Sequence, residues 1–207
     1  MRIVFVCTTN VWGSAMAELV ARSLLSEWDP ERQLVQVYSA GVRAQIGAPI
    51  PMSGQQVLAE RGLDGSTHQA RWMSPEVLAA ADLTLTMGEI QRDAALALNP
   101  RGLRSTFTLR EAAGLLAATP VAAPLAPEPD RHARAVVAGM AAARRFRGVP
   151  AGSDDLPDLL VDAMAPVRAL ADQVEAGVRT VLGAVLLPGF GARQVAPEAP
   201  AAAAAVA

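Results

Sequence analysis

The first 28 residues have the pattern of a buried strand, a tight loop and a helix. Residues 2–6 (RIVFV) are mostly apolar and β-branched, which is typical of a strand covered on both faces. Residues 7–13 are turn-like, and residues 14–28 then carry apolar side chains at helical spacing, with Ser14 as a candidate N-cap. A strand that passes through a tight loop into a helix opens an α/β unit, so this segment constrains the fold of the whole chain.

The rest of the chain continues the alternation of strands and helices. Further strands are predicted at residues 34–39, 83–87 and 105–109, and helices at 52–61, 75–81, 88–98, 110–116, 133–147 and 162–186. We therefore expect an α/β fold with three layers (α/β/α) around a four-stranded, mostly parallel sheet. One domain is predicted over residues 1–187, and the Pro/Ala-rich residues 188–207 are expected to be a disordered tail.

Composition excludes several classes of partner and cofactor. The net charge of −2 gives no basic footprint for nucleic acid, and no apolar stretch reaches the roughly 18–20 residues of a membrane span. The N-terminus does not read as a signal peptide, so we expect a cytoplasmic protein. One cysteine and two histidines predict no intramolecular disulfide and no metal site, and no organic cofactor is implied. The sequence does not define an oligomeric state.

The loop after the first strand carries the chemistry. Cys7 ends the strand and Ser14 opens the helix, so backbone N–H groups and a helix N-terminus would meet at the loop centre. Such a loop binds a phosphate-like dianion and favours a thiolate nucleophile at Cys7, although a small buried apolar residue is the alternative. The predicted ligand contacts are the intervening residues, Thr8, Thr9, Asn10, Val11, Trp12 and Gly13.

The wider string VFVCTTNVWGSAMAE resembles the signature of the low-molecular-weight protein tyrosine phosphatases, hydrophobic-C-x-G-N-x-C-R-S-P-M-A-E. The resemblance continues in order through residues 39–41, 68–71, 81–87, 108–111 and 154–158. It implies that Cys7 is a nucleophile and that Ser14 eases departure of its thiolate. It also implies that Ser39 and His68 hold Asn10 in place, and that Asp158 is the general acid. A solvated loop acid or an N-cap of the last helix is the alternative for Asp158.

Four positions depart from the signature, one of them Ala15 in place of a proline. Gly13 stands where the family has the arginine that clamps phosphate, Trp12 replaces the second cysteine, and Thr9 replaces a glycine. Loss of a phosphate-clamping arginine would cost about 10³–10⁵ in rate by analogy with other phosphoryl transfers. Arg43, Arg71 and Arg110 are candidates to replace it.

Three functional interpretations remain open. The first is a phosphatase-like protein with a degenerate loop, weakly active or inactive, that binds an anionic or phosphorylated ligand or partner protein. The second is an active phosphotyrosine hydrolase that forms a phosphocysteine at Cys7. The third is a different Cys7-dependent enzyme acting on a non-phosphate substrate.

Outside the loop, the sequence leads to three expectations about individual side chains. We expect His132 to be exposed and Trp72 and Met73 to be core residues. The arginine cluster at 144, 145 and 147 is expected to be a solvated helix end.

Overall fold

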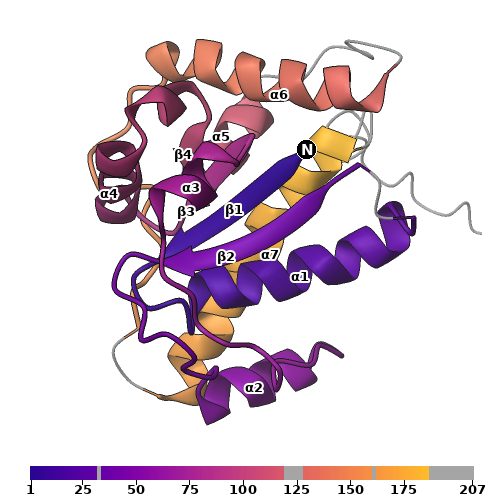
Figure 1. The fold of residues 1–207 in the computed structure, drawn as a ribbon, viewed down its shortest axis with the longest axis vertical. Helices are drawn as coiled ribbons and strands as arrows, with labels where there is room; N and C mark the ends of the chain where they lie inside the picture. The colour runs from indigo at the N-terminus through magenta and orange to yellow at the C-terminus, as the bar shows by residue number, and fades with distance from the viewer. Residues whose placement is uncertain (32–33, 119–127, 160–161, 187–207) are drawn as a thin grey trace, which may run out of the picture.

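In a computed structural model of the chain, the described residues are 1–31, 34–118, 128–159 and 162–186. The tail predicted at 188–207 lies outside them. At the centre is a four-stranded sheet in the order β2-β1-β3-β4, in which every pair of neighbouring strands is parallel (Figure 1). Its strands are β1 (Arg2–Cys7), β2 (Gln36–Gly41), β3 (Leu83–Thr86) and β4 (Thr106–Thr108). The predicted fold class is confirmed.

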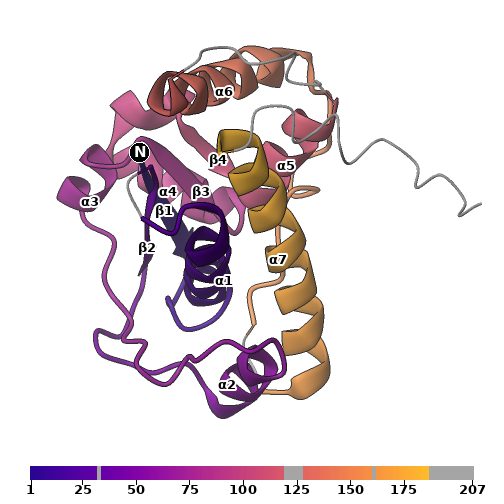
Figure 2. The ribbon, with the colours of Figure 1, turned by 90° about the vertical axis from the view of Figure 1, so that its right-hand side faces the viewer.

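Helices cover both faces of the sheet, as expected for parallel strands. They are α1 (Gly13–Trp28), α2 (Met52–Ala59), α3 (Pro75–Ala79), α4 (Glu89–Leu98), α5 (Leu109–Ala118), α6 (Pro129–Ala143) and α7 (Met164–Leu186), with 3₁₀ turns η1 (Pro100–Arg104) and η2 (Arg144–Phe146). Figure 2 shows α7 on one side of the strands and α3 on the other.

Alternate residues of β1 enter two separate apolar clusters. Ile3, Phe5 and Cys7 belong to the larger cluster, together with side chains of α1, α5 and α7. Val4 and Val6 belong to a smaller cluster that contains Leu78 of α3 and Ala95 of α4. This alternation is the period of two that a strand imposes on its side chains, and it makes β1 the central element of the domain.

Element boundaries differ from the predictions mainly at β2 and α6. The second strand starts two residues late because the N–H groups of Leu34 and Val35 donate to Asp29 Oδ2 at 2.9 and 3.2 Å instead of entering the sheet. It extends to Gly41, which pairs with Cys7. Helix α6 starts at Pro129 rather than 133, because proline is favourable in the first helical turn.

Three side-chain expectations were wrong. His132 is 2% exposed, and its Nε2 lies 2.9 Å from the carbonyl oxygen of Ala184 in α7. Trp72 is 51% exposed, whereas Met73 is buried as predicted. Arg145 is exposed as expected, but Arg144 is partly buried: it stacks 4.1 Å from the ring centroid of Phe107 and donates to Glu111. His132 is buried because it lies on the inward face of α6, and Arg144 is held at the protein surface by its ion pair with Glu111.

Among the described helices, none combines the length and the apolar character that crossing a membrane requires.

Candidate functional site

Cys7 lies at the carboxyl end of β1 with its sulfur inside the following loop. The Ser14 hydroxyl lies 2.9 Å from Cys7 Sγ and the Asn10 N–H lies 3.1 Å from it, each as a donor. The sulfur thus has a hydrogen-bond donor from the loop and another from the first turn of α1. Ser14 is not the N-cap that the sequence predicts, because α1 already begins at Gly13. No side chain caps the N-terminus of this helix.

The backbone carbonyl groups of the loop accept hydrogen bonds from neighbouring parts of the chain. The oxygens of Cys7 and Thr8 accept from the N–H groups of Val42 and Arg43 at 3.0 and 2.8 Å, and the oxygen of Trp12 accepts from Met16. Because N–H and C=O point in opposite directions across a planar trans peptide, the next N–H groups along the chain point away from these contacts.

The backbone N–H groups of the loop are correspondingly free. Within the described part of the chain, those of Thr8, Thr9, Val11 and Trp12 have no hydrogen-bond acceptor. Carbonyl groups turned outward and unpaired N–H groups on the loop form the kind of concavity that binds an anion beside a helix N-terminus.

Asn10 is the residue that fixes the shape of the loop. Its φ of 60° is in the left-handed region, which asparagine tolerates better than most residues. Its side-chain amide donates to Ser14 Oγ at 3.0 Å and accepts from the Arg71 N–H at 2.8 Å. Its carbonyl oxygen lies 2.7 Å from His68 Nε2. The structure thus brings Asn10, Ser14 and His68 together.

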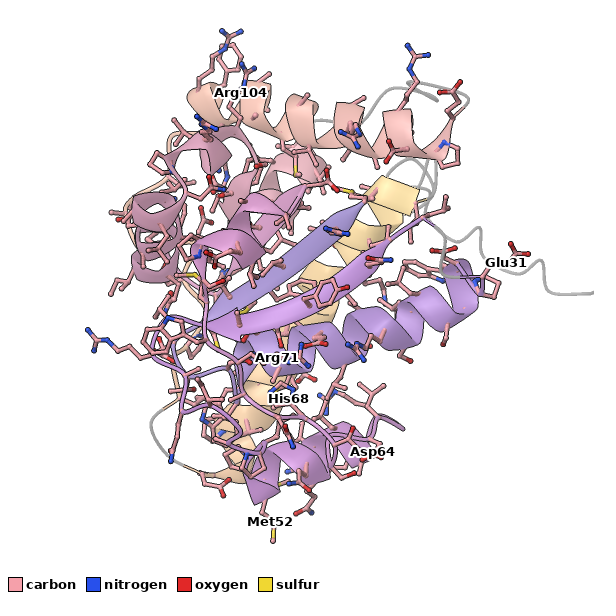
Figure 3. All side chains as sticks on the ribbon, in the orientation of Figure 1. Glu31, Met52, Asp64, His68, Arg71 and Arg104 are labelled. Atoms are coloured by element: carbon pink, nitrogen blue, oxygen red, sulfur yellow. The ribbon has the colours of Figure 1, made fainter. Side chains whose placement is uncertain are left out.

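His68 supports the loop as a neutral donor. Its side chain is buried, and this burial lowers its pKa from the usual 6.5, while the bond to the Asn10 carbonyl opposes the shift. A neutral imidazole whose Nε2 faces a carbonyl oxygen must carry its proton on Nε2. Figure 3 shows His68 between α1 and α2, with Arg71 closer to β2.

Ser39 has a different partner from the one that the resemblance implies. Its hydroxyl donates to Glu18 of α1 rather than to Asn10. Glu18 is 2% exposed, and it also pairs with Arg22 at 2.5 Å and with Arg71 at 3.7 Å. Sequence reasoning did not identify the partners of Glu18, although a carboxylate on the buried face of a helix is itself a signal of a buried polar network.

Asp158 lies over the loop although it is 150 residues from it in sequence. Its Oδ2 accepts a hydrogen bond of 2.6 Å from the Thr8 hydroxyl, which in turn accepts from Gln91 Nε2 at 2.8 Å. The N-cap alternative for Asp158 does not hold, because α7 begins at Met164. Gln91 was missed by the sequence analysis, since a single glutamine in a helix gives no signal.

The segment before Asp158 is anchored to the β3–α4 junction. Asp155 Oδ1 accepts from the Glu89 N–H at 2.7 Å, and the Leu156 N–H donates to the Met87 carbonyl at 2.7 Å. Asp154 pairs with Arg147 in a bidentate contact, so this arginine too is not simply solvated. These contacts hold the segment that places the Asp158 carboxylate beside Thr8 of the loop.

Gly13 lies against Met87. A Cβ atom at position 13 would lie 2.9 Å from Met87 Cγ and 3.1 Å from its sulfur. A side chain at this position therefore requires Met87 to move.

Trp12 points away from the loop concavity into the core. Its side chain is 7% exposed and belongs to the larger apolar cluster. A Cβ atom built on Gly54 of α2 would lie 3.1 Å from its ring, which places the ring against that helix. The predicted contact of Trp12 with a ligand is thereby limited to its backbone. Thr9 Oγ1 is buried and has no partner among the described residues.

Two of the three candidate replacement arginines have side-chain partners outside the loop. Arg71 pairs with Glu18, and Arg110 Nη1 donates to the carbonyl of Asp155 at 3.4 Å. Arg43 contacts the loop through its backbone N–H. No guanidinium of these three is hydrogen bonded to residues 7–13 in the described structure. The described residues also contain no cluster of three or more His, Cys, Asp or Glu side chains suited to a metal ion.

Comparison with known proteins identifies relatives of this architecture. The sequence model of the family "Low molecular weight phosphotyrosine protein phosphatase" matches residues 2–120. A probable low-molecular-weight protein-tyrosine-phosphatase, EpsP, of Ralstonia solanacearum is 35% identical over 109 residues, which are 53% of this chain and 70% of that protein. A protein-arginine-phosphatase of Geobacillus stearothermophilus is 31% identical over 112 residues, with the same shares of 53% and 70%.

Solved structures agree on the fold. The low-molecular-weight protein tyrosine phosphatase of T. tengcongensis superposes with a TM-score of 0.62 at 22% identity, covering 88% of this chain and 97% of the other. The YwlE arginine phosphatase of Geobacillus stearothermophilus gives 0.61 at 23% identity, covering 86% and 88%. With a family match over more than half of its length and a parallel sheet that ends in the Cys7 loop, the chain belongs to the low-molecular-weight phosphotyrosine protein phosphatase family.

Proposed function

We propose that the Cys7 loop of this chain binds an anionic or phosphorylated ligand and hydrolyses phosphoesters weakly or not at all. The ligand would be held by the free loop N–H groups and the N-terminus of α1. Cys7, Ser14 and Asn10 would keep the loop in the conformation that presents those donors.

The observation that carries this proposal is Gly13 with Met87 packed against it. An arginine at this point contributes a planar guanidinium that clamps two phosphate oxygens and neutralises charge in the transition state. Gly13 contributes only its backbone, and the thioether of Met87 that lies beside it carries no charge. Ground-state binding through N–H groups would survive this change, whereas stabilisation of the transition state would not.

The chemical class of the ligand is inferred from the relatives. They are named for phosphotyrosine and phosphoarginine substrates, which share a phosphoryl dianion on a planar side chain. A phosphorylated side chain of a partner protein is therefore the ligand that we propose for this loop.

A second candidate is an active phosphomonoester hydrolase. The contact between Asp158 and Thr8 favours it, because a carboxyl group at the loop is where a general acid would protonate a leaving group. In this alternative Cys7 forms the phosphocysteine and Asp158 activates water for its hydrolysis.

The test measures hydrolysis of 4-nitrophenyl phosphate by the wild-type protein and by Cys7→Ser, Gly13→Arg and Gly13→Arg/Met87→Ala. The double variant is included because a Cβ atom at position 13 meets Met87 at 2.9 Å. We expect wild-type activity close to that of Cys7→Ser, and a gain of about 10³-fold or more in the double variant. Binding of phosphotyrosine and phosphoarginine to the wild-type protein is measured by calorimetry.

Two results would contradict the proposal. Efficient phosphate release by the wild-type protein that disappears in Cys7→Ser would establish the active hydrolase instead. A wild-type protein that neither hydrolyses nor binds any of the phosphate compounds, but whose Cys7 reacts with an acyl thioester, would favour the non-phosphate enzyme.

A further inference from the structure

A groove lies along the outer part of the sheet, on the face opposite α1. Its volume is about 320 Å³, and it is bordered by Val4 of β1, Tyr38 of β2 and Val77 of α3. Val4 and Tyr38 are neighbours in the parallel register, so their side chains share this face. Helix α3 buries Leu78 in the smaller apolar cluster, with Val4 of β1 and Ala40 of β2, and the groove lies beside this cluster.

Two exposed aromatic side chains border this groove, which we call the β2 groove. Trp72 is 51% exposed and Tyr38 is 41% exposed. Large aromatic side chains left in solvent around a concave apolar surface are typical of sites that bury a planar ligand. Trp72 is also held in position, because its backbone bridges to Gly41 of β2.

The charged side chains that border the β2 groove are basic. Arg2 and Arg71 both border it. The Arg2 guanidinium has no ion-pair partner among the described residues, since Asp82 accepts from the backbone N–H of Arg2 instead. A small anion would therefore find an unpaired guanidinium at one end of the groove.

Arg71 can also turn to a ligand at low cost. Its contact with Glu18 is long, at 3.7 Å, and Glu18 already has Arg22 at 2.5 Å and the Ser39 hydroxyl as partners. Loss of the Arg71 contact would not leave the buried carboxylate without a donor, so the penalty for an unpaired buried charge does not arise.

We propose that the β2 groove is a second binding site, separate from the Cys7 loop, for a small aromatic acid. The planar ring would lie between Trp72 and Tyr38, and the carboxylate would pair with Arg2, with Arg71 as a second cation bordering the groove. The volume is at the lower end of the range of about 300–1,000 Å³ for small-molecule sites, which suits one fused ring system. The proposal does not depend on whether the Cys7 loop is catalytically active.

The test is calorimetric titration of the full chain with 2-naphthoate. Two comparison compounds separate the contributions: 2-naphthylmethanol keeps the ring without the charge, and cyclohexanecarboxylate keeps the charge without the aromatic ring. We expect saturable binding of one 2-naphthoate per chain and binding at least about tenfold weaker for each comparison compound.

Variants locate the site. Trp72→Ala and Arg2→Gln should each weaken binding of 2-naphthoate about tenfold. The matched controls are Phe146→Ala, which removes an exposed aromatic ring elsewhere, and Arg101→Gln, which removes an arginine of η1; both should bind like the wild-type protein. Arg2→Gln keeps the test decisive if Trp72→Ala fails to fold, which circular dichroism would reveal.

Three results would overturn the proposal. The first is the absence of saturable 2-naphthoate binding. The second is equal binding by the wild-type protein and both groove variants, with displacement by inorganic phosphate, which would assign the ligand to the Cys7 loop. The third is a dimer in sedimentation experiments that Trp72→Ala dissociates, which would mean that a second copy of the chain occupies the groove.

Discussion

Gly13 changes the loop in two ways at the scale of a single residue. By the resemblance to the family signature, it stands in place of an arginine, and it lets the Met87 side chain approach the loop backbone. The first change was visible in the sequence, because the signature fixes the spacing from Cys7. The second was not, because Met87 is 74 positions further along the chain and its approach depends on how β3 is paired.

His68 makes the stability of the protein depend on pH. Burial lowers its pKa below the usual 6.5, so the unfolded chain takes up a proton at a pH at which the folded chain does not. The free energy of unfolding should therefore fall as the pH drops below 6.5, by up to about 1.4 kcal/mol per pH unit, until the lower pKa of the folded state is reached.

Urea denaturation at pH 7.5 and pH 5.5 measures this effect. His68→Gln keeps a donor for the Asn10 carbonyl but cannot titrate, so its free energy of unfolding should change less between the two pH values. An equal change in the wild-type protein and the variant would show that His68 does not contribute.

At the scale of elements, the packing of α7 on α5 depends on one glycine. A Cβ atom at Gly177 would lie 2.8 Å from Leu109 Cγ, whereas one at Gly139 of α6 would meet nothing within 4 Å. Both glycines are inside helices, so replacing either with alanine removes the same backbone entropy from the unfolded chain.

The two alanine variants should consequently change stability in opposite directions. Gly177→Ala should lower the free energy of unfolding by about 1–3 kcal/mol through overpacking against Leu109. Gly139→Ala should raise it by about 0.5–1 kcal/mol. Thermal denaturation of both variants beside the wild-type protein measures the difference, and a destabilised Gly139→Ala would contradict this account.

At the scale of the whole molecule, local pattern was enough to predict the elements but not all of their partners. Parallel pairing follows from the alternation of strands and helices, and each predicted strand was found within two residues of its start, whereas the order of the strands was not predicted. The burial of His132 was also readable, since it shares a helical face with Val136 and Met140. This spacing predicts burial of His132, but the sequence analysis gave more weight to the neighbouring arginines, which favour exposure.

Contacts between residues that are far apart in the sequence could not be predicted from local sequence patterns. Ser39 and Glu18 are 21 positions apart, and nothing in either local segment indicates that they bond to each other. Asp158 could be related to the loop only through the resemblance, because 150 residues separate it from Thr8. Periodicity indicates which side of an element is buried, but it does not indicate which other element covers it.

The segment around Arg71 joins the two sites that we propose. Its backbone N–H holds the Asn10 side chain of the Cys7 loop, and its guanidinium borders the β2 groove. A ligand that shifts this segment changes the free energy of both sites, and thermodynamic linkage requires the effect to be mutual. If 2-naphthoate alters the affinity for phosphotyrosine by some factor, phosphotyrosine must alter the affinity for 2-naphthoate by the same factor. Paired calorimetric titrations would measure this coupling as a single number.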